Sequence, residues 1–482
     1  MSVSQLYSLD ELVSATGGAV RGAPAGVTGL SIDTRSLAPG DAFFAITGDN
    51  SDGHAYVGRA LENGAALAVV ARDRAQALAS GAFAPDAPLL LVDDVLEALR
   101  ATAVAARARS QAGIVAVTGS VGKTTTKEAL RLALSADGPT HASAASYNNH
   151  WGVPLSLARL PREARYGVFE IGMNHPGEIT PLVRLVRPQV AIITTVEPVH
   201  IAQFSSIEEI ADAKAEIFDG LEAGGAVVLN IDNPQFARLK AAAQAKGVGR
   251  IVTFGADAGA DVRLVDMCLK ATCSTLVADV LGTRLTLKVG TPGRHIIQNV
   301  LAVLAAVKLL GADLALAALA LSALKPPPGR GVPIELAVAG GTATLLDESY
   351  NANPASMRAA IDVLSRTPVG PRGRRIAVLG DMLELGTDGP LHHRELAAPL
   401  RAAGIDLVFA SGPLMHDLWG ALPSNMRGGY APNAEALTKL LSSAIRSGDT
   451  LMVKGSNGSR MGPLVKSLAE RFRTPDEALL EG

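Results

Sequence analysis

The sequence predicts an α/β protein built from three domains, each with a sheet covered by helices. Three observations lead to this prediction. The chain has 482 residues, which at roughly 100–200 residues per domain is enough for two to four domains. Short apolar runs alternate with helical patterns along most of the chain, which is typical of mostly parallel sheets. The proline-rich run 325–329 interrupts this alternation.

Composition excludes several other classes of protein. The 44 basic and 46 acidic residues nearly balance, so no charge excess indicates a nucleic-acid partner. The two cysteines, Cys268 and Cys273, are too few for a disulfide framework and lack the spacing of a zinc site. The first residues lack the basic and apolar segments of a signal peptide. We therefore expect a cytoplasmic protein, and we expect it to be a monomer.

The most apolar stretch, residues 302–324, is predicted to form a buried helical pair. Lys308 and Asp313 interrupt it, and alanine supplies much of its apolar character. A membrane-spanning helix needs about 20 predominantly apolar residues with few or no charges. The sequence therefore predicts no membrane span.

Residues 1–108 are predicted to form a small α/β domain. Residues 8–12 have the composition of a helix start. The short apolar runs 42–46 and 89–92 are typical of strands, and residues 58–66 between them have helical spacing.

Residues 109–324 are predicted to form a central domain, with a mostly parallel sheet of the phosphate-loop type and flanking helices. A buried strand at 114–117 leads into a glycine-rich turn, and a helical pattern follows at 127–134. Helical stretches separate several further apolar runs, namely 167–171, 190–194, 226–229 and 250–254.

Residues 325–482 are predicted to form a Rossmann-like α/β domain. The run 325–329 is a linker, because its three prolines fix φ and remove three backbone donors. A second alternating pattern follows the linker, with apolar runs at 343–346, 375–379, 407–410 and 450–453.

The glycine-rich turn after the strand at 114–117 predicts a phosphate-binding loop. Its backbone N–H groups and the following helix N-terminus would hold phosphate oxygens, Lys123 would face the β- and γ-phosphates, and the Thr124 hydroxyl would ligate Mg²⁺. ATP is favoured over GTP because the chain has no Asn-Lys-x-Asp motif. The predicted ATP contacts are Thr118, Gly119, Ser120, Val121, Gly122, Lys123, Thr124 and Thr125.

The short form of this loop resembles that of the Mur ligases and their folylpolyglutamate synthetase relatives. Only Ser120 and Val121 separate Gly119 from Gly122, whereas the general phosphate loop has four residues between its glycines. Mur ligases use ATP and Mg²⁺ to join an amine to a carboxylate through an acyl-phosphate. The resemblance implies the same chemistry here, with Lys123 as a catalytic residue.

Three further residues match metal-binding positions of the family. Glu170 ends a predicted strand, where ligands of open α/β sheets collect. The resemblance implies that Glu170 and Thr124 hold Mg²⁺, and that His200 helps to hold a second Mg²⁺. It also implies that Lys214, in Ala-Lys-Ala-Glu-Ile-Phe, is a metal ligand as a carbamate. Lys214 and His200 are therefore expected to be catalytic.

The family also has nucleotide contacts beyond the loop. The segment 293–299 is similar to Gly-x-His-Asn-x-x-Asn, with Ile296 at the first Asn, and implies ATP contacts for His295 and Asn299. Arg330, after the proline linker, matches an arginine that reaches the phosphates when the C-terminal domain closes. Asp347 is expected near the ribose, although Glu348 stands where the family has a second Asp.

The C-terminal domain resembles the family members that add D-alanyl-D-alanine. The strings Asp-Glu-Ser-Tyr-Asn-Ala-Asn-Pro-Ala-Ser-Met from residue 347 and Gly-Asp-Met-Leu-Glu-Leu-Gly from residue 380 match them. Asn457 stands where the family usually has Arg. No Asp-Asn-Pro-Arg motif of the diaminopimelate-adding relatives occurs. The residues expected near the amine substrate are Asn351, Asn353, Lys454, Gly455 and Ser456.

The N-terminal segment resembles the UDP-binding domain of Mur ligases that act late on the stem peptide. Hydroxyl and carboxylate groups suit uracil and ribose, and an arginine suits a diphosphate. Asn149 belongs to a segment similar to Asn-Asn-x-x-Gly-x-Pro, which Ala145 and Ser146 precede where the family usually has Gly-Asn. The residues expected to contact the UDP substrate are Ser31, Asp33, Thr34, Arg35, Asp52, His54 and Asn149.

Together these resemblances imply a peptidoglycan-synthesis ligase that adds D-alanyl-D-alanine to UDP-N-acetylmuramoyl-tripeptide. Two alternatives remain open. A sister ligase would add another amino acid, such as diaminopimelate. A phosphate-loop switch or motor would hydrolyse ATP without an amine acceptor.

Overall fold

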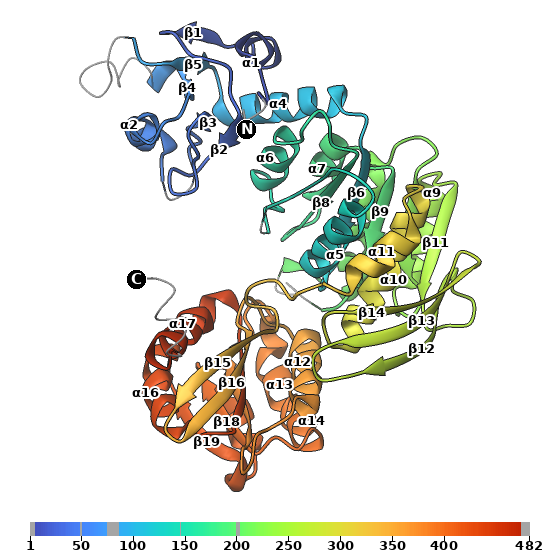
Figure 1. The fold of residues 1–482 in the computed structure, drawn as a ribbon, viewed down its shortest axis with the longest axis vertical. Helices are drawn as coiled ribbons and strands as arrows, with labels where there is room; N and C mark the ends of the chain where they lie inside the picture. The colour runs from blue at the N-terminus through green and yellow to red at the C-terminus, as the bar shows by residue number, and fades with distance from the viewer. Residues whose placement is uncertain (1–4, 49–50, 75–85, 145, 199–202, 474–482) are drawn as a thin grey trace.

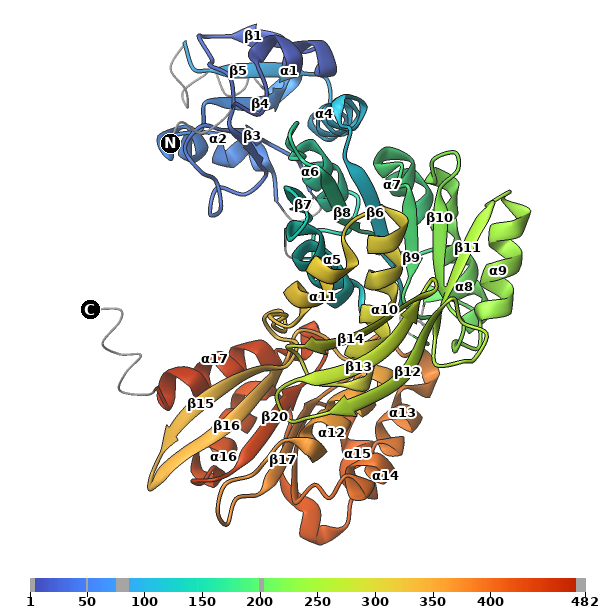
Figure 2. The same ribbon diagram turned by 45° about the vertical axis from the view of Figure 1, so that its right-hand side comes forward.

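In the computed structural model, three sheets follow one another along the chain (Figure 1). The structure describes residues 5–48, 51–74, 86–144, 146–198 and 203–473. Helices pack against each sheet, and the predicted α/β architecture is confirmed. The central domain lies between the two others in Figure 1, and Figure 2 shows the three sheets turned by 45°.

The N-terminal sheet has the strand order β1-β5-β4-β3-β2. Only β1 runs antiparallel to its neighbour. Helix α1 of this domain begins after Ser8. The Ser8 hydroxyl accepts a hydrogen bond from the Glu11 N–H, and the Glu11 carboxylate accepts one from the Ser8 N–H. The elements are α1 (Leu9–Thr16), β1 (Ala19–Arg21), β2 (Gly29–Ser31), β3 (Asp41–Phe44), α2 (Val57–Glu62), β4 (Leu67–Ala71) and β5 (Leu89–Val92).

Helix α4 (Val95–Arg109) packs against both α1 and α6 (Gly152–Ala158), and so joins the first two domains. Two long-range hydrogen bonds fix the same junction. The Tyr7 hydroxyl donates to the Ala158 carbonyl at 2.6 Å, and Arg159 Nε donates to the Leu30 carbonyl at 2.7 Å. The N-terminal domain is therefore anchored on the central domain through buried groups.

The central sheet has nine strands in the order β14-β13-β12-β11-β10-β9-β6-β8-β7. Strands β6 to β12 pair in parallel, and β12, β13 and β14 form an antiparallel extension that the sequence reasoning did not predict. The strands are β6 (Gly113–Thr118), β7 (Thr140–Ala142), β8 (Tyr166–Glu170), β9 (Val190–Ile193), β10 (Ala226–Asn230), β11 (Arg250–Gly255), β12 (Val262–Leu269), β13 (Ser274–Val280) and β14 (Thr283–Val289).

Helix α10 (Arg294–Leu309) forms the apolar centre of this domain. All residues from Asn299 to Val307 are buried, against α5 and strands β9 to β13. Helix α11 (Leu314–Leu321) follows it, and the Asp313 carboxylate caps its first turn. The predicted helical pair is thus present, but α11 is only partly buried, because its Leu316 and Leu319 are 43% and 72% exposed. The other helices are α5 (Lys123–Ser135), α7 (Ile179–Val186), α8 (Ile207–Ala215) and α9 (Phe236–Ala245).

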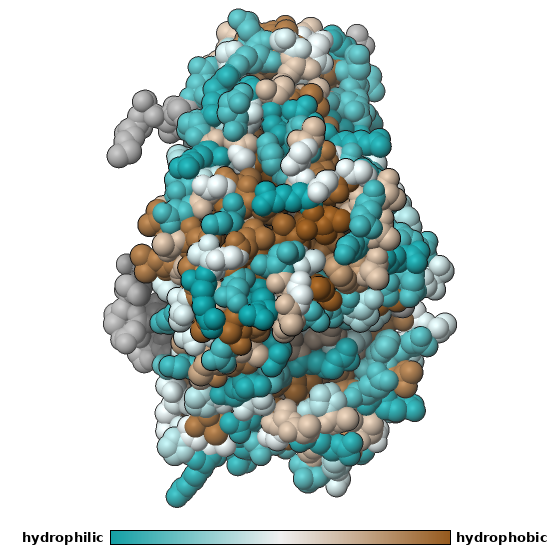
Figure 3. Space-filling model, turned by 90° about the vertical axis from the view of Figure 1, so that its right-hand side faces the viewer, coloured by the Kyte–Doolittle hydropathy of each residue, from teal (hydrophilic) through white to brown (hydrophobic). Residues whose placement is uncertain are grey.

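Within the described ranges, the structure contains no helix that is long and apolar enough to span a membrane. The face seen in Figure 3 gathers hydrophobic residues near its middle, at the height of the central domain, with more hydrophilic residues above and below.

The C-terminal sheet has the order β15-β16-β20-β17-β18-β19, with only β15 antiparallel. Its strands are β15 (Val332–Val338), β16 (Gly341–Glu348), β17 (Arg375–Gly380), β18 (Leu407–Ser411), β19 (Arg427–Ala431) and β20 (Thr450–Lys454). Its helices are α12 (Pro354–Arg366), α13 (Gly389–Glu395), α14 (Ala397–Ala402), α15 (Met415–Ala421), α16 (Ala434–Ala444) and α17 (Met461–Arg471).

One buried histidine holds the loop after β17. His393 is fully buried on α13, and its Nε2 accepts a hydrogen bond from the Met382 N–H at 2.9 Å. Its Nδ1 therefore carries the proton and donates to the Gly389 carbonyl at 2.6 Å. Burial lowers the pKa of His393 below its ordinary value of 6.5. A protonated ring could not accept from Met382, so the folded protein holds His393 neutral.

This burial predicts a loss of stability in mild acid. Below about pH 6.5 the unfolded chain takes up a proton that folded His393 excludes, so the free energy of unfolding falls by up to about 1.4 kcal/mol per pH unit. Urea unfolding between pH 8 and pH 5 would measure this slope. We predict a shallower slope for His393→Gln and an unchanged slope for His392→Gln, whose side chain pairs with Glu395 at the surface. Equal slopes in all three proteins would contradict the assignment.

Candidate active site

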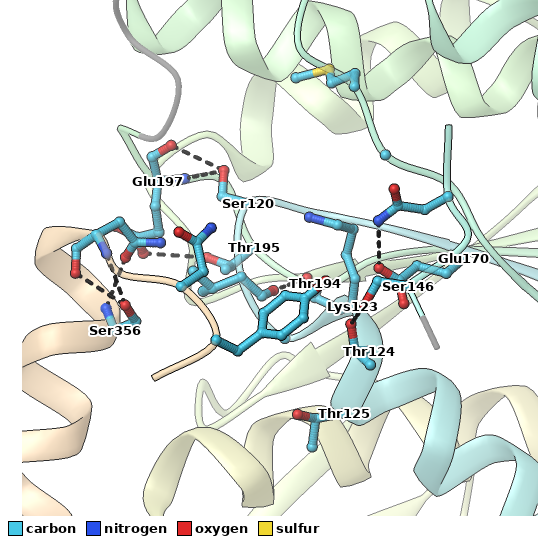
Figure 4. A pocket seen from close by; sticks show the side chains of 18 of the residues that line it. Ser120, Lys123, Thr124, Thr125, Ser146, Glu170, Thr194, Thr195, Glu197 and Ser356 are labelled. Carbon is cyan, nitrogen blue, oxygen red and sulfur yellow. Dashed lines mark hydrogen bonds between the residues drawn. The ribbon is translucent and has the colours of Figure 1, made fainter. Parts of the chain in front are cut away.

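A cavity of about 1020 Å³ lies between the central and C-terminal domains. Its central-domain wall contains the loop at 120–125 and the ends of β8 and β9 (Figure 4). The N-terminal end of α10 completes that wall, and Gly329, Arg330, the segment around 348–356 and Lys454 form the opposite one. The central and C-terminal domains therefore both contribute charged and polar side chains to one cavity.

The loop between β6 and α5 is shaped by two glycines. Gly119 and Gly122 have φ values of 150° and 85°, which favour glycine. A Cβ at Gly119 would lie 1.9 Å from Thr194 Oγ1, and one at Gly122 would lie 2.8 Å from Asn299 Oδ1. The Thr194 hydroxyl also donates to the Val121 carbonyl at 2.6 Å. Neighbouring elements thus fit the loop closely and leave no room for larger residues at the glycines.

The predicted phosphate-loop contacts divide into two groups. Residues 120–125 line the cavity. Thr118 is fully buried at the end of β6, and neither it nor Gly119 is among the residues that line the cavity. These two residues support the loop, and those that follow them form its surface.

Lys123 enters the cavity from the first turn of α5. Its Nζ donates to the Gly119 carbonyl at 2.7 Å. Burial lowers the pKa of Lys123, the nearby charge of Glu170 acts in the opposite direction, and that of Arg330 lowers it further. Arg330 of the C-terminal domain is therefore close enough to Lys123 of the central domain for its charge to lower the pKa of that lysine.

Glu170 at the end of β8 has one carboxylate oxygen held by the protein. Asn148 Nδ2 donates to Glu170 Oε1 at 2.7 Å, whereas Oε2 is buried and has no hydrogen-bond partner among the described residues. A buried carboxylate oxygen needs a partner, and a hard cation would supply one. Thr124 lines the same cavity as Glu170, and its Oγ1 lies 3.4 Å from Ser146 Oγ. These oxygen donors fit Mg²⁺.

Asn148 was not among the predicted site residues, although its neighbour Asn149 was. The feature of the sequence that could have identified Asn148 is its place in an Asn-Asn pair shortly before helix α6. In the described part of the chain, no group of three or more His, Cys, Asp or Glu side chains converges as a metal cage. Mg²⁺ commonly takes one or two carboxylates and completes its shell with phosphate oxygens and water.

Lys214 on α8 is 2% exposed. Burial lowers its pKa well below the ordinary value, and the charge of Lys123 lowers it further. Lys214 makes no ion pair with any described residue. His200, which we expected beside it, lies outside the residues that the structure describes.

The C-terminal wall contributes Arg330, Glu348 and Lys454. The Arg330 guanidinium lies 4.3 Å from the centre of the Tyr350 ring. Lys454 Nζ donates to the Asn351 carbonyl at 2.9 Å and lies 3.4 Å from Glu348 Oε2. Burial lowers the pKa of Lys454, and the charge of Glu348 opposes this shift.

The structure distinguishes the two acids at the end of β16. Glu348 lines the cavity, whereas Asp347 does not. Asp347 Oδ1 instead accepts hydrogen bonds from the N–H and hydroxyl of Ser349, at 3.0 and 2.6 Å. Of the pair, Asp347 was the predicted ATP contact, and Glu348 is the one that faces the ligand space.

His295 and Asn299, the predicted contacts on α10, both line the cavity. His295 is an exposed residue at the cavity wall, and desolvation by the surrounding protein lowers its pKa. Asn299 lies against Gly122, so it contacts the phosphate loop directly.

The predicted amine-substrate residues are only partly brought together. Asn351, Asn353 and Lys454 line the cavity, whereas Ser456 lines a smaller one beside it. Gly455 is a packing position, because a Cβ there would lie 2.4 Å from Ser459 Oγ.

Most of the predicted UDP contacts lie in the N-terminal domain and away from this cavity. Asn149 is the exception and lines it. Asp33 and Arg35 form an ion pair with 2.6 Å between Oδ2 and Nη2. His54 uses both ring nitrogens within its domain, with Asp52 Oδ1 at 2.6 Å and the Ala71 N–H at 3.0 Å. The His54 side chain therefore stabilises the N-terminal domain, where both of its ring nitrogens already have partners.

The remaining two predicted UDP contacts, Ser31 and Thr34, are buried in this domain. The Ser31 hydroxyl donates to the Asp33 carbonyl at 3.0 Å. The Thr34 carbonyl accepts from Asn63 at 3.2 Å. Both residues thus help to shape the segment that carries Asp33 and Arg35.

Comparison with known proteins places these features in a family. The models named "Mur ligase family, catalytic domain", "Mur ligase middle domain" and "Mur ligase, glutamate ligase domain" match residues 26–125, 117–307 and 335–457. The UDP-N-acetylmuramoyl-tripeptide--D-alanyl-D-alanine ligase of Escherichia coli is 35% identical, over 96% of this chain and 98% of its own. The enzyme of that name from Synechocystis is 34% identical, over 92% of each chain.

A solved structure agrees with the sequence relatives. The crystal structure of MurF from Acinetobacter baumannii superposes with a TM-score of 0.81 at 27% identity, covering 98% of this chain and 100% of that one. The three family models together match well over half of the sequence. The chain therefore belongs to the Mur ligase family.

Proposed function

We propose that this protein is an ATP-dependent ligase that adds D-alanyl-D-alanine to UDP-N-acetylmuramoyl-tripeptide in peptidoglycan synthesis. The observation that carries the proposal is the cavity in which Lys123 and Glu170 of one domain face Arg330 and Lys454 of another. The names of its full-length relatives give the same reaction, and the string from Asp347 to Met357 resembles the D-alanyl-D-alanine-adding members.

We assign one ligand to each domain. Residues 1–108 would bind the UDP moiety, residues 109–324 ATP, and residues 325–482 the dipeptide. These limits fall between the three sheets. The residues proposed for UDP binding remain Ser31, Asp33, Thr34, Arg35, Asp52 and His54, together with Asn149 at the cavity.

The reaction needs two anions to meet. A carboxylate oxygen of the tripeptide attacks the γ-phosphorus of ATP, and ADP leaves with the bonding electrons. The dipeptide amine then attacks the acyl carbon of the acyl-phosphate, inorganic phosphate leaves, and the amine nitrogen loses a proton. Lys123 and Arg330 would offset the repulsion between carboxylate and phosphate, and the N–H groups of the glycine-rich loop would hold the phosphate oxygens.

We propose that Mg²⁺ is held by Thr124 and Glu170, and by His200 and Lys214 as its carbamate. Bound there, it would neutralise phosphate charge and orient the transferred group. The free Oε2 of Glu170 supports this role. We propose that His295, Asn299 and Glu348, with Asp347 behind it, position the rest of the nucleotide. We place the reaction in the cytoplasm, where ATP is supplied, and expect a monomer.

A phosphate-release assay tests the function directly. We expect wild-type turnover to require ATP, UDP-N-acetylmuramoyl-tripeptide and D-alanyl-D-alanine together. Lys123→Ala should lower kcat at least about 100-fold, because the transferred phosphate loses its main cationic contact. Lys240→Ala, at an exposed position on α9, is the matched control. Release with diaminopimelate in place of the dipeptide would indicate a sister ligase. Release without any amine would indicate a switch.

Asn148→Ala tests the metal site without removing a ligand. Its amide orients Glu170, and loss of such a supporting contact typically weakens metal binding about 10- to 100-fold. We predict a corresponding rise in the Mg²⁺ concentration needed for half-maximal ATP binding, measured by calorimetry without the other substrates. Asn425→Ala, at an exposed site in the C-terminal domain, should leave it unchanged. An unaltered Mg²⁺ requirement in Asn148→Ala would argue against this role.

Lys214 should carry a carbamate. Only a neutral amine reacts with CO₂, and burial together with the charge of Lys123 lowers the pKa of Lys214, which raises its neutral fraction. Protein equilibrated with ¹³C-bicarbonate should show a carbamate carbon by NMR, lost in Lys214→Arg and kept in Lys240→Arg. A signal that persists in Lys214→Arg would place the modification elsewhere.

A further inference from the structure

Helix α6 lies between the N-terminal domain and the cavity. It is next to α4 in Figure 1, and it packs against α4, α7 and strand β2 of the N-terminal domain. All of its residues, Gly152–Ala158, are buried. The residues at 148–150, which line the cavity, come shortly before its first turn. The placement of α6 therefore helps to set the position of part of the cavity wall.

The N-terminal domain binds the C-terminal end of this helix. The Tyr7 hydroxyl donates to the carbonyl of Ala158, the last residue of α6, at 2.6 Å. The Arg159 guanidinium, one residue further along, donates from both Nε and Nη2 to the Leu30 carbonyl of β2. Tyr7 and Leu30 are buried. Hydrogen bonds in such low-dielectric surroundings are strong, so they hold this end of α6 firmly against the N-terminal domain.

Trp151, the residue before α6, makes a second contact with the N-terminal domain. A Cβ on Gly48 would lie 2.6 Å from Trp151 Cη2 and 3.2 Å from Cζ2, so the edge of the indole ring rests on the Gly48 backbone. The Gly48 N–H donates to the Ser51 carbonyl at 2.9 Å. The neighbouring Thr47 hydroxyl donates to Asp52 Oδ1 at 3.1 Å. Trp151 therefore contacts the loop that carries Asp52, one of the residues proposed for UDP binding.

The turn before α6 connects this indole contact to the proposed metal site. Asn149 Oδ1 accepts hydrogen bonds from the Trp151 N–H and from the first N–H of α6, at 3.3 and 2.9 Å. The Asn148 carbonyl accepts from the Gly172 N–H at 2.8 Å, and its Nδ2 donates to Glu170 Oε1 at 2.7 Å. The turn is thus fixed on one side by the N-terminal domain and on the other by the end of β8.

On the basis of the ligase function proposed above, we propose that Trp151 is a positioning residue, through which substrate held by the N-terminal domain stabilises the orientation of Glu170. A bound UDP group favours one placement of the loop around Asp52, and the indole ring transmits it to the turn before α6. Asn148 in that turn holds Glu170 Oε1 and leaves Oε2 for Mg²⁺. Linkage is reciprocal, so the UDP substrate and Mg²⁺ each tighten the binding of the other.

Calorimetry with and without UDP-N-acetylmuramoyl-tripeptide tests this linkage. The measured quantity is the Mg²⁺ concentration that gives half-maximal binding of a non-hydrolysable ATP analogue. In the wild type, saturating UDP-tripeptide should lower it at least about 5-fold. Trp151→Ala should lose most of this effect, and Trp151→Phe, which keeps an aromatic ring, should restore part of it. Trp419→Phe, at the other tryptophan of the chain, is the matched control and should keep the effect in full.

The measurement separates positioning from two other roles of the indole ring. A merely structural role would lower the amount of folded protein and leave the Mg²⁺ concentration for half-maximal binding unchanged. A direct contact between the tripeptide carboxylate and Mg²⁺ would persist in Trp151→Ala. An undiminished effect of the UDP-tripeptide in Trp151→Ala, or the absence of any effect in the wild type, would therefore overturn the proposal.

Gly48→Ala tests the same contact from the other domain, and it decides the question if Trp151→Ala does not fold. Gly48 has no left-handed φ, so the added methyl group acts mainly on the indole ring. The variant should weaken the linkage as Trp151→Ala does. The double variant should be no worse than Trp151→Ala alone, because the ring that the methyl group displaces is then missing. Losses that add in the double variant would count against the contact as the route.

Turnover of the wild type distinguishes this proposal from the proposed function. If phosphate release does not require the UDP-tripeptide, the function itself fails. If release requires it while Trp151→Ala and Gly48→Ala both keep the full effect of the UDP-tripeptide on Mg²⁺, the function stands and Trp151 has no positioning role.

Discussion

The close packing of the turn between β6 and α5 is the constraint on which the site depends. Gly119 lies against Thr194 at the end of β9, and Gly122 lies against Asn299 of α10. Neither position has room for a side chain. The turn's shape is therefore set by the strand next to β6 and by the most buried helix of the domain, and not by the glycine-rich segment alone. The large apolar core thus fixes the direction of a few backbone N–H groups.

Electrostatics connects this turn to the C-terminal domain. Lys123 is influenced by Arg330, Lys214 by Lys123, and Lys454 by Arg330. Burial and mutual repulsion each lower the pKa of the three lysines, because both disfavour an additional positive charge. Such a group of cations is best compensated by polyanionic ligands. Nucleotide phosphates and a substrate carboxylate, shared between two domains, are ligands of this kind.

The sequence predicted most of the buried parallel strands and the phosphate turn, because such strands form continuous apolar runs. It did not predict β12, β13 and β14, where buried and partly exposed residues alternate along β13 and polar residues interrupt the apolar pattern. It also favoured Asp347 as the nucleotide contact, whereas Glu348 is the residue that lines the cavity. Neighbouring strand residues point to opposite faces, and only the folded sheet shows which face meets the ligand.

The hydrogen bond from Lys123 to the Gly119 carbonyl has a consequence for nucleotide entry. The ammonium group has three N–H donors, and the Gly119 carbonyl, 2.7 Å away, accepts one of them. Two donors remain for phosphate oxygens, so a phosphate can bind Lys123 without displacing the carbonyl. The internal contact also fixes the direction of the side chain, which reduces the ordering that binding requires.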